Sequence, residues 1–143
     1  MKFPSRIFID TSYLIALLNS NDTDHARATK FQAQLSTQKA HKITSEYVLM
    51  ELGDGLSRLR FRPLAQKMLE LIHADNTFEI IPSSTVLFNQ ARALFNQRPD
   101  KEWGMTDCSS FIIMQNFGLH AALTADQHFE QAGFQALLRI DED

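Results

Sequence analysis

Short apolar runs that end abruptly at a polar residue alternate along this chain with segments of helical periodicity. The first run, Ile7-Phe8-Ile9, stops at Asp10, which is typical of a strand buried on both faces of a parallel sheet. Further strands are predicted over 42–44, 78–81, 121–124 and 134–140. Helices are expected over about 11–19, 24–38, 45–59, 63–74, 85–95 and 106–117. This alternation indicates an α/β fold built from parallel β-α-β units.

The composition is that of a compact globular protein. A length of 143 residues with 44% hydrophobic residues predicts one domain over 1–143. The only cysteine, Cys108, excludes an internal disulfide and a thiolate zinc site, which favours a reducing, cytoplasmic location. No apolar stretch approaches the roughly 20 residues that a membrane helix needs, so neither a membrane segment nor a targeting signal is expected. The net charge of −3 leaves local binding of nucleic acid open.

Four acidic residues stand where functional groups collect in such a fold. Asp10 and Asp126 follow predicted strands, whose carboxyl ends form the usual ligand-binding edge of an open α/β sheet, while Glu51 and Asp107 lie on predicted helices. Each alone has an ordinary explanation, as a helix cap, a turn residue or a glutamate at the rim of a helix. Gathered at one edge, however, four carboxylates repel one another unless a cation neutralises them. A divalent metal site explains all four.

Hydroxyl groups accompany two of these acids. Thr11 and Ser12 follow Asp10, and either could cap the helix and leave Asp10 to face outward. Ser110 lies one turn after Asp107, where it could hydrogen-bond a metal-bound water.

Other kinds of site find little support in the sequence. The five histidines show no spacing typical of a zinc site, and only His128 lies near an acid. No glycine-rich run resembles a phosphate-binding loop. Ordinary structural roles are expected for these histidines and glycines.

Four segments together resemble the PIN-domain family, and within it the VapC-type toxins of bacterial toxin–antitoxin operons. They are FIDTSYLIALL (8–18), VLMEL (48–52), WGMTDCSSFIIM (103–114) and ALTADQHFEQAGF (122–134). By this resemblance the family's acidic quartet is matched by Asp10, Glu51, Asp107 and Asp126, and its supporting polar positions by Thr11 and Ser110. Gly104 departs from the serine expected before the hydrophobic-Thr-Asp step.

The resemblance implies a three-layer α/β/α sandwich around a central parallel β-sheet, and endonucleolytic cleavage of RNA that depends on Mg²⁺ or Mn²⁺. In this hypothesis Asp10, Glu51 and Asp107 hold the main ion, and Asp126 orients the attacking water or a second ion. It also implies three partners: an RNA substrate, a cognate antitoxin protein and a second copy of the chain in a homodimer.

Three alternatives stay open at this point. The first is an RNA-processing PIN nuclease outside any toxin–antitoxin pair, and the second is a non-catalytic α/β binding module. The third, a phosphotransfer domain of receiver or haloacid-dehalogenase type, is disfavoured by the sequence. Ser12 stands where the phosphatase pattern needs a second Asp, and Thr124-Ala125-Asp126 lacks the lysine of a receiver.

Overall fold

A five-stranded, wholly parallel sheet with the order β3-β2-β1-β4-β5 forms the centre of the protein. The computed structural model describes residues 4–140, so the outermost ends of the predicted domain 1–143 lie outside the described residues. The strands are β1 (Arg6–Ile9), β2 (His41–Ser45), β3 (Phe78–Ile81), β4 (Ala121–Leu123) and β5 (Gln135–Ala136). The predicted parallel α/β architecture is confirmed.

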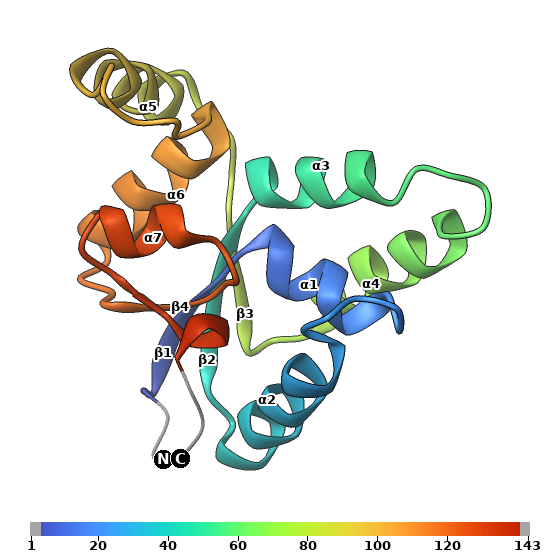
Figure 1. Cartoon of the computed structure of the whole chain (residues 1–143). Coiled ribbons are helices and arrows are strands. Elements are labelled where there is room, and N and C mark those ends of the chain that lie inside the picture. The colour runs from blue at the N-terminus through green and yellow to red at the C-terminus, as the bar shows by residue number, and fades with distance from the viewer. Residues whose placement is uncertain (1–3, 141–143) are drawn as a thin grey trace.

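Helices cover both faces of this sheet. They are α1 (Thr11–Leu18), α2 (His25–Gln38), α3 (Glu46–Gly55), α4 (Arg62–Ala74), α5 (Thr85–Gln97), α6 (Met105–Asn116) and α7 (Gln127–Gln131), and a 3₁₀ turn, η1 (Leu137–Arg139), follows β5. Figure 1 shows α1 to α4 on one side of the sheet and α6 and α7 on the other, with α5 beside α6. The three-layer arrangement implied by the resemblance is confirmed. No helix within residues 4–140 combines the length and apolar character needed to cross a membrane.

The core contains an aromatic cluster where α6 and α7 pack on β1, the central strand. Phe8 on β1 is fully buried and lies 6.3 Å, centroid to centroid, from the ring of Phe129 on α7. Phe129 in turn meets Phe111 of α6 edge to face at 5.0 Å, and Phe111 meets Trp103 at 5.0 Å. Such aromatic pairs add to the free energy that their burial already contributes. This cluster fixes the two helices that carry Asp107 and Asp126 against the strand that carries Asp10.

The structure departs clearly from the predicted helices and strands in three places. The helix predicted over 45–59 ends at Gly55, so Leu59 lies beyond it and is 88% exposed. The strand predicted over 134–140 is only two residues long and gives way to η1. The short helix α7 was not predicted, because five residues are too few to display helical periodicity.

Candidate metal centre

The carboxyl ends of β1 and β4 lie side by side and bring distant parts of the chain together. Ile9 pairs with Leu123, and the Asp10 N–H donates to the Leu123 carbonyl oxygen at 3.2 Å. The connections after β1 and β3 lead to opposite sides of β1, so the sheet reverses its winding between β1 and β4. Open α/β sheets bind ligands at such a reversal. Asp10 follows β1 directly, and Asp126 follows β4 after two intervening residues, close to where the sequence predicted it.

Asp10 is held in place by hydroxyl groups. Its carboxylate Oδ2 accepts hydrogen bonds from Ser12 Oγ at 2.9 Å and from Thr124 Oγ1 at 2.7 Å. Asp10 itself is the N-cap of α1, through a bond of 3.4 Å from the Ser12 N–H. The prediction that Thr11 or Ser12 would provide this cap was therefore wrong. Asp10 is only 5% exposed, so these donors partly replace the water that a buried carboxylate loses.

Thr124 connects Asp10 to the third segment of the site. Besides donating to Asp10, Thr124 Oγ1 accepts a hydrogen bond of 3.0 Å from the Asp126 N–H. Ser12 Oγ accepts a bond of the same length from the Ala125 N–H. The loop after β4 is thus tied to the start of α1. Sequence reasoning did not predict the hydrogen bonds from Ser12 and Thr124 to the Asp10 carboxylate, although both hydroxyls lie within two residues of a predicted site acid.

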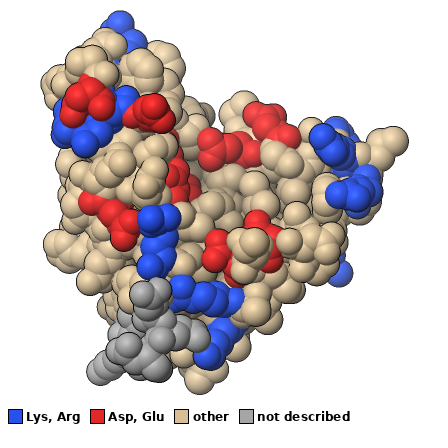
Figure 2. Space-filling view, viewed as in Figure 1, with Lys and Arg blue, Asp and Glu red and all other residues tan. Residues whose placement is uncertain are grey.

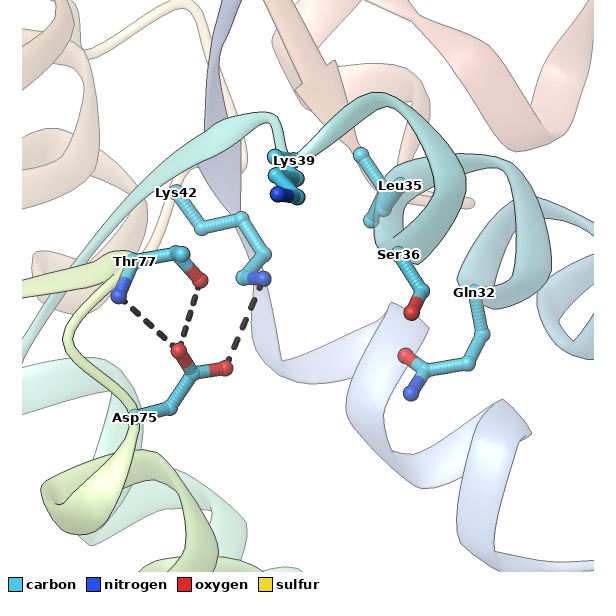
Figure 3. A pocket seen from close by; sticks show the side chains of 7 residues that line it. All are labelled: Gln32, Leu35, Ser36, Lys39, Lys42, Asp75 and Thr77. Carbon is cyan, nitrogen blue, oxygen red and sulfur yellow. Dashed lines mark hydrogen bonds and ion pairs between the residues drawn. The ribbon is translucent and has the colours of Figure 1, made fainter.

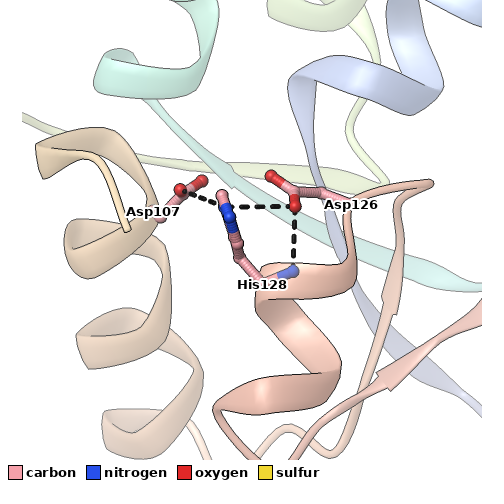
Figure 4. A group of neighbouring side chains, drawn as sticks. All are labelled: Asp107, Asp126 and His128. Atoms are coloured by element: carbon pink, nitrogen blue, oxygen red, sulfur yellow. Dashed lines mark hydrogen bonds and ion pairs between the residues drawn. The ribbon is translucent and has the colours of Figure 1, made fainter. Parts of the chain in front are cut away.

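Asp107 and Asp126 face one another across the ring of His128 (Figure 4). The His128 Nδ1 atom lies 3.1 Å from Asp107 Oδ2 and 3.2 Å from Asp126 Oδ1. Asp126 is the N-cap of α7 and accepts the His128 N–H at 2.8 Å, which folds the ring back over the start of the helix. Asp107 Oδ2 also accepts the Gly104 N–H at 3.0 Å at the start of α6. Ligand atoms of these three residues all lie within 4.8 Å of one another.

Burial and mutual repulsion perturb two of the carboxyl groups. Burial raises the pKa of Asp10 to about 6, and the nearby charge of Asp107 adds to the increase, while hydrogen bonds from Thr124 and Ser12 oppose it. Burial also raises the pKa of Asp107, and the charge of Asp126 raises it further. Asp10, Asp107 and Asp126 are therefore electrostatically coupled, and a bound cation would relieve the repulsion.

The side chains of three other predicted site residues do not hydrogen-bond to the three aspartates in the described structure. They are those of Glu51, Thr11 and Ser110. Glu51 is exposed on α3, and within residues 4–140 no hydrogen bond or ion pair joins it to the three aspartates. The hydroxyl of Thr11 donates to the Val48 carbonyl oxygen of α3 at 3.4 Å. The Ser110 side chain is fully buried one turn after Asp107, and its Oγ has no hydrogen-bond partner among the described residues. Ser110 therefore keeps a free hydrogen-bonding group close to the site.

The surface around the site is hollowed and acidic. Figure 2 shows a depression between the side of the molecule that carries α6 and α7 and the side that carries α3, with Asp and Glu side chains on both walls. Glu51 belongs to α3 and is exposed. An acidic depression suits a cation, and carboxylate oxygens with partial solvent access are ligands that Mg²⁺ and Mn²⁺ prefer.

A second pocket, lined by α2, β2 and the loop before β3, lacks this chemistry (Figure 3). Its acid, Asp75, already faces the Lys42 ammonium group at 3.6 Å and accepts the Thr77 hydroxyl at 2.7 Å. These partners lower the pKa of Asp75, in contrast to the raised pKa values at the first site. Asp75 is neutralised by the protein itself and leaves little negative charge for a metal ion.

The PIN domain family profile matches residues 7–135, which include all four predicted acids. The chain belongs to the PIN domain family. It is 29% identical over 128 residues to the 23S rRNA-specific endonuclease VapC20 of Mycobacterium tuberculosis, and the match covers 90% of this chain and 95% of that protein. The family expected from the sequence motifs is thereby confirmed.

Solved structures agree with the PIN fold. The structure of M. tuberculosis VapC20, described as a sarcin-ricin loop cleaving toxin, superimposes with a TM-score of 0.78 at 28% identity and covers 90% of this chain and 95% of that chain. FitAcB of Neisseria gonorrhoeae gives a TM-score of 0.62 at 18% identity, covering 91% and 94% of the two chains. VapBC2 of Rickettsia felis, bound to a promoter DNA fragment, gives 0.61 at 16%, covering 92% and 96%. The last two support the fold alone.

Proposed function

We propose that this PIN domain is a divalent-metal-dependent endoribonuclease of the VapC type, and the toxin of a toxin–antitoxin pair. The observation that carries the proposal is the convergence of Asp10, Asp107 and Asp126 from three separate segments, with raised pKa values at Asp10 and Asp107. Such perturbed carboxyl groups in a depression are characteristic of functional sites. The similarity to VapC20, which is named as an rRNA endonuclease, supports the reaction class.

Asp10, Glu51, Asp107 and Asp126 are the residues proposed to hold Mg²⁺ or Mn²⁺, either directly or through water. The donor set suits such an ion, because hard carboxylate oxygens dominate it and their repulsion is otherwise uncompensated. When bound by these carboxylates, such an ion would supply the chemistry of a metal nuclease, lowering the pKa of water for attack on the phosphodiester and stabilising the leaving oxygen.

The residues of the chain orient the carboxylates for this task. The hydroxyls of Ser12 and Thr124 hold Asp10 in one position, and the Gly104 N–H holds Asp107 at the start of α6. Ordered carboxylates do not need to be reorganised when the reaction begins, which is how active sites lower barriers. Ser110, buried and unpartnered in the described structure, is proposed to hydrogen-bond a water in the site.

Three partners belong to the proposal: structured RNA as substrate, a cognate antitoxin and a second copy of the chain. The site of action proposed is the cytoplasm, where such RNA is found. An RNA-processing role without an antitoxin is the alternative, and it uses the same chemistry.

The test is cleavage of a mixed pool of structured RNAs, including 23S rRNA, with Mg²⁺ or Mn²⁺. It compares the wild type, Asp10→Asn, an EDTA control and Asp54→Asn, in which an exposed aspartate on α3 is changed in the same way. Cleavage by the wild type and by Asp54→Asn, but not by Asp10→Asn or in EDTA, is expected. If folded, antitoxin-free protein cuts no RNA with either metal, the non-catalytic binding module replaces the nuclease. Co-purification with the product of a neighbouring gene tests the antitoxin separately.

A further inference from the structure

We propose that His128 supplies a nitrogen ligand to the metal and makes this centre prefer Mn²⁺ to Mg²⁺. The inference rests on the proposed metal site and extends its ligand set beyond the four acids. It concerns a residue that the sequence marked only as lying near an acid. The observation that carries it is the position of the His128 Nδ1 atom, which faces both Asp107 and Asp126 (Figure 4).

The distances from the His128 nitrogen to the two carboxylate oxygens suit a metal site. Nδ1 lies 3.1 Å from Asp107 Oδ2 and 3.2 Å from Asp126 Oδ1. Two neighbouring ligands of an octahedral ion with bonds of about 2.1 Å are separated by roughly 3.0 Å. The nitrogen can therefore share one ion with either oxygen with little movement, and the three ligand atoms all lie within 4.8 Å of one another. Hydrogen bonding from Nδ1 alone has similar distances, so the experiment must separate ligation from hydrogen bonding.

The partial solvent exposure of these three side chains also suits metal ligands. The side chains of Asp107, His128 and Asp126 are 17%, 21% and 30% exposed, so an ion can reach them from solvent. The backbone that carries the ring is held in place, because the His128 backbone N–H is bound to Asp126 and the next residue, Phe129, is fully buried. From this fixed backbone the side chain lies with its Nδ1 atom toward both carboxylates.

A nitrogen ligand changes which ion the site prefers. Mg²⁺ takes oxygen ligands almost exclusively and gives up its waters reluctantly, whereas transition metals accept imidazole readily. A site of aspartates with one imidazole therefore gains more with Mn²⁺ than with Mg²⁺. Replacing His128 should weaken Mn²⁺ binding and leave Mg²⁺ binding nearly unchanged.

The variant His128→Asn separates ligation from positioning. An asparagine amide can donate the same hydrogen bonds to Asp107 and Asp126 but offers no imidazole nitrogen. The matched control is His120→Asn, at an exposed histidine outside this cluster. Purified full-length protein is loaded with less than one equivalent of Mn²⁺, and electron spin-echo modulation is recorded for nitrogen coupled to the ion. Titration calorimetry gives the Mn²⁺ and Mg²⁺ affinities.

We expect nitrogen coupling in the wild type and in His120→Asn, and its loss in His128→Asn. The Mn²⁺ affinity of His128→Asn should fall by about tenfold or more, with a much smaller change for Mg²⁺. Bound Mn²⁺ without nitrogen coupling, or an unchanged ratio of Mn²⁺ to Mg²⁺ affinity in His128→Asn, overturns the inference while leaving the proposed nuclease intact. If the wild type binds neither ion, the proposed metal site itself fails and the inference fails with it.

Discussion

Replacing Asp10 by asparagine is expected to stabilise the metal-free protein at neutral pH, although it removes a residue of the proposed active site. Burial first, and then the charge of Asp107, raise the pKa of Asp10 from 3.8 to about 6. The folded chain thus binds this proton more tightly than the unfolded chain. The stabilisation that this proton gives the folded state is present at low pH, is lost as the pH rises from about 4 to about 6, and stays lost above that range.

The size of the effect follows from the same pKa. At about 1.4 kcal/mol for each tenfold change in proton affinity, ionised Asp10 costs the fold about 3 kcal/mol at pH 7. Asparagine is neutral and can still accept the hydroxyl hydrogen bonds of Ser12 and Thr124, but its amide N–H groups need new partners in a buried place. We therefore expect Asp10→Asn to raise the free energy of unfolding by about 1–3 kcal/mol at pH 7.5.

Urea denaturation in EDTA at pH 7.5 and at pH 4.5 measures this difference. At pH 4.5 most of the wild type already carries the proton in the folded state, so the gap between the two proteins should shrink. The control Asp54→Asn, at an exposed site, should stay within about 0.5 kcal/mol of the wild type at both pH values. A gap that is absent at pH 7.5, or equal at the two pH values, refutes the electrostatic reasoning. Addition of Mn²⁺ should stabilise the wild type and not Asp10→Asn.

Three further variants test other parts of the structure. Gly104→Ser should raise the free energy of unfolding in urea by about 0.5–1 kcal/mol. Gly104 is the N-cap of α6 in an extended conformation, and the Cβ of a serine there would make only ordinary contacts. A lower urea midpoint than that of the wild type would contradict this capping role. Phe129→Ala should cost about 3–5 kcal/mol by the same assay, and a loss below 1 kcal/mol contradicts the aromatic core. Glu51→Gln should leave the free energy of unfolding of the metal-free protein within about 0.5 kcal/mol of the wild type, since Glu51 is exposed and separate from the three aspartates. It should still reduce RNA cleavage, because Glu51 is one of the proposed metal-binding residues. Stabilisation like that of Asp10→Asn would instead place Glu51 among the repelling carboxylates.

The arrangement of strands and helices was largely predictable because the chain obeys its local rules. The run Ile7-Phe8-Ile9 is buried on both faces of the sheet, and α6 begins and ends within one residue of its predicted bounds. The strand predicted over 134–140 is shorter than expected for a reason that lies outside its own sequence. Its partner β4 has three residues, and only Gln135 and Ala136 find a neighbour there. The length of an edge strand depends on the strand beside it, which local periodicity does not contain.

The candidate site shows the same contrast between features that local sequence predicts and features that depend on neighbouring segments. Strand ends indicate which edge of the sheet Asp10 and Asp126 share, so their proximity could be expected from topology. The position of the His128 ring could not, because it depends on the short helix α7, which lacks periodicity, and on the packing of Phe129 beneath it. The hydroxyl of Thr124 likewise reaches Asp10 only because β1 and β4 are neighbours. Residue types therefore indicated candidate acids, of which Asp10, Asp107 and Asp126 come together, whereas the groups that hold Asp10 in place depend on tertiary contacts between segments more than 100 positions apart.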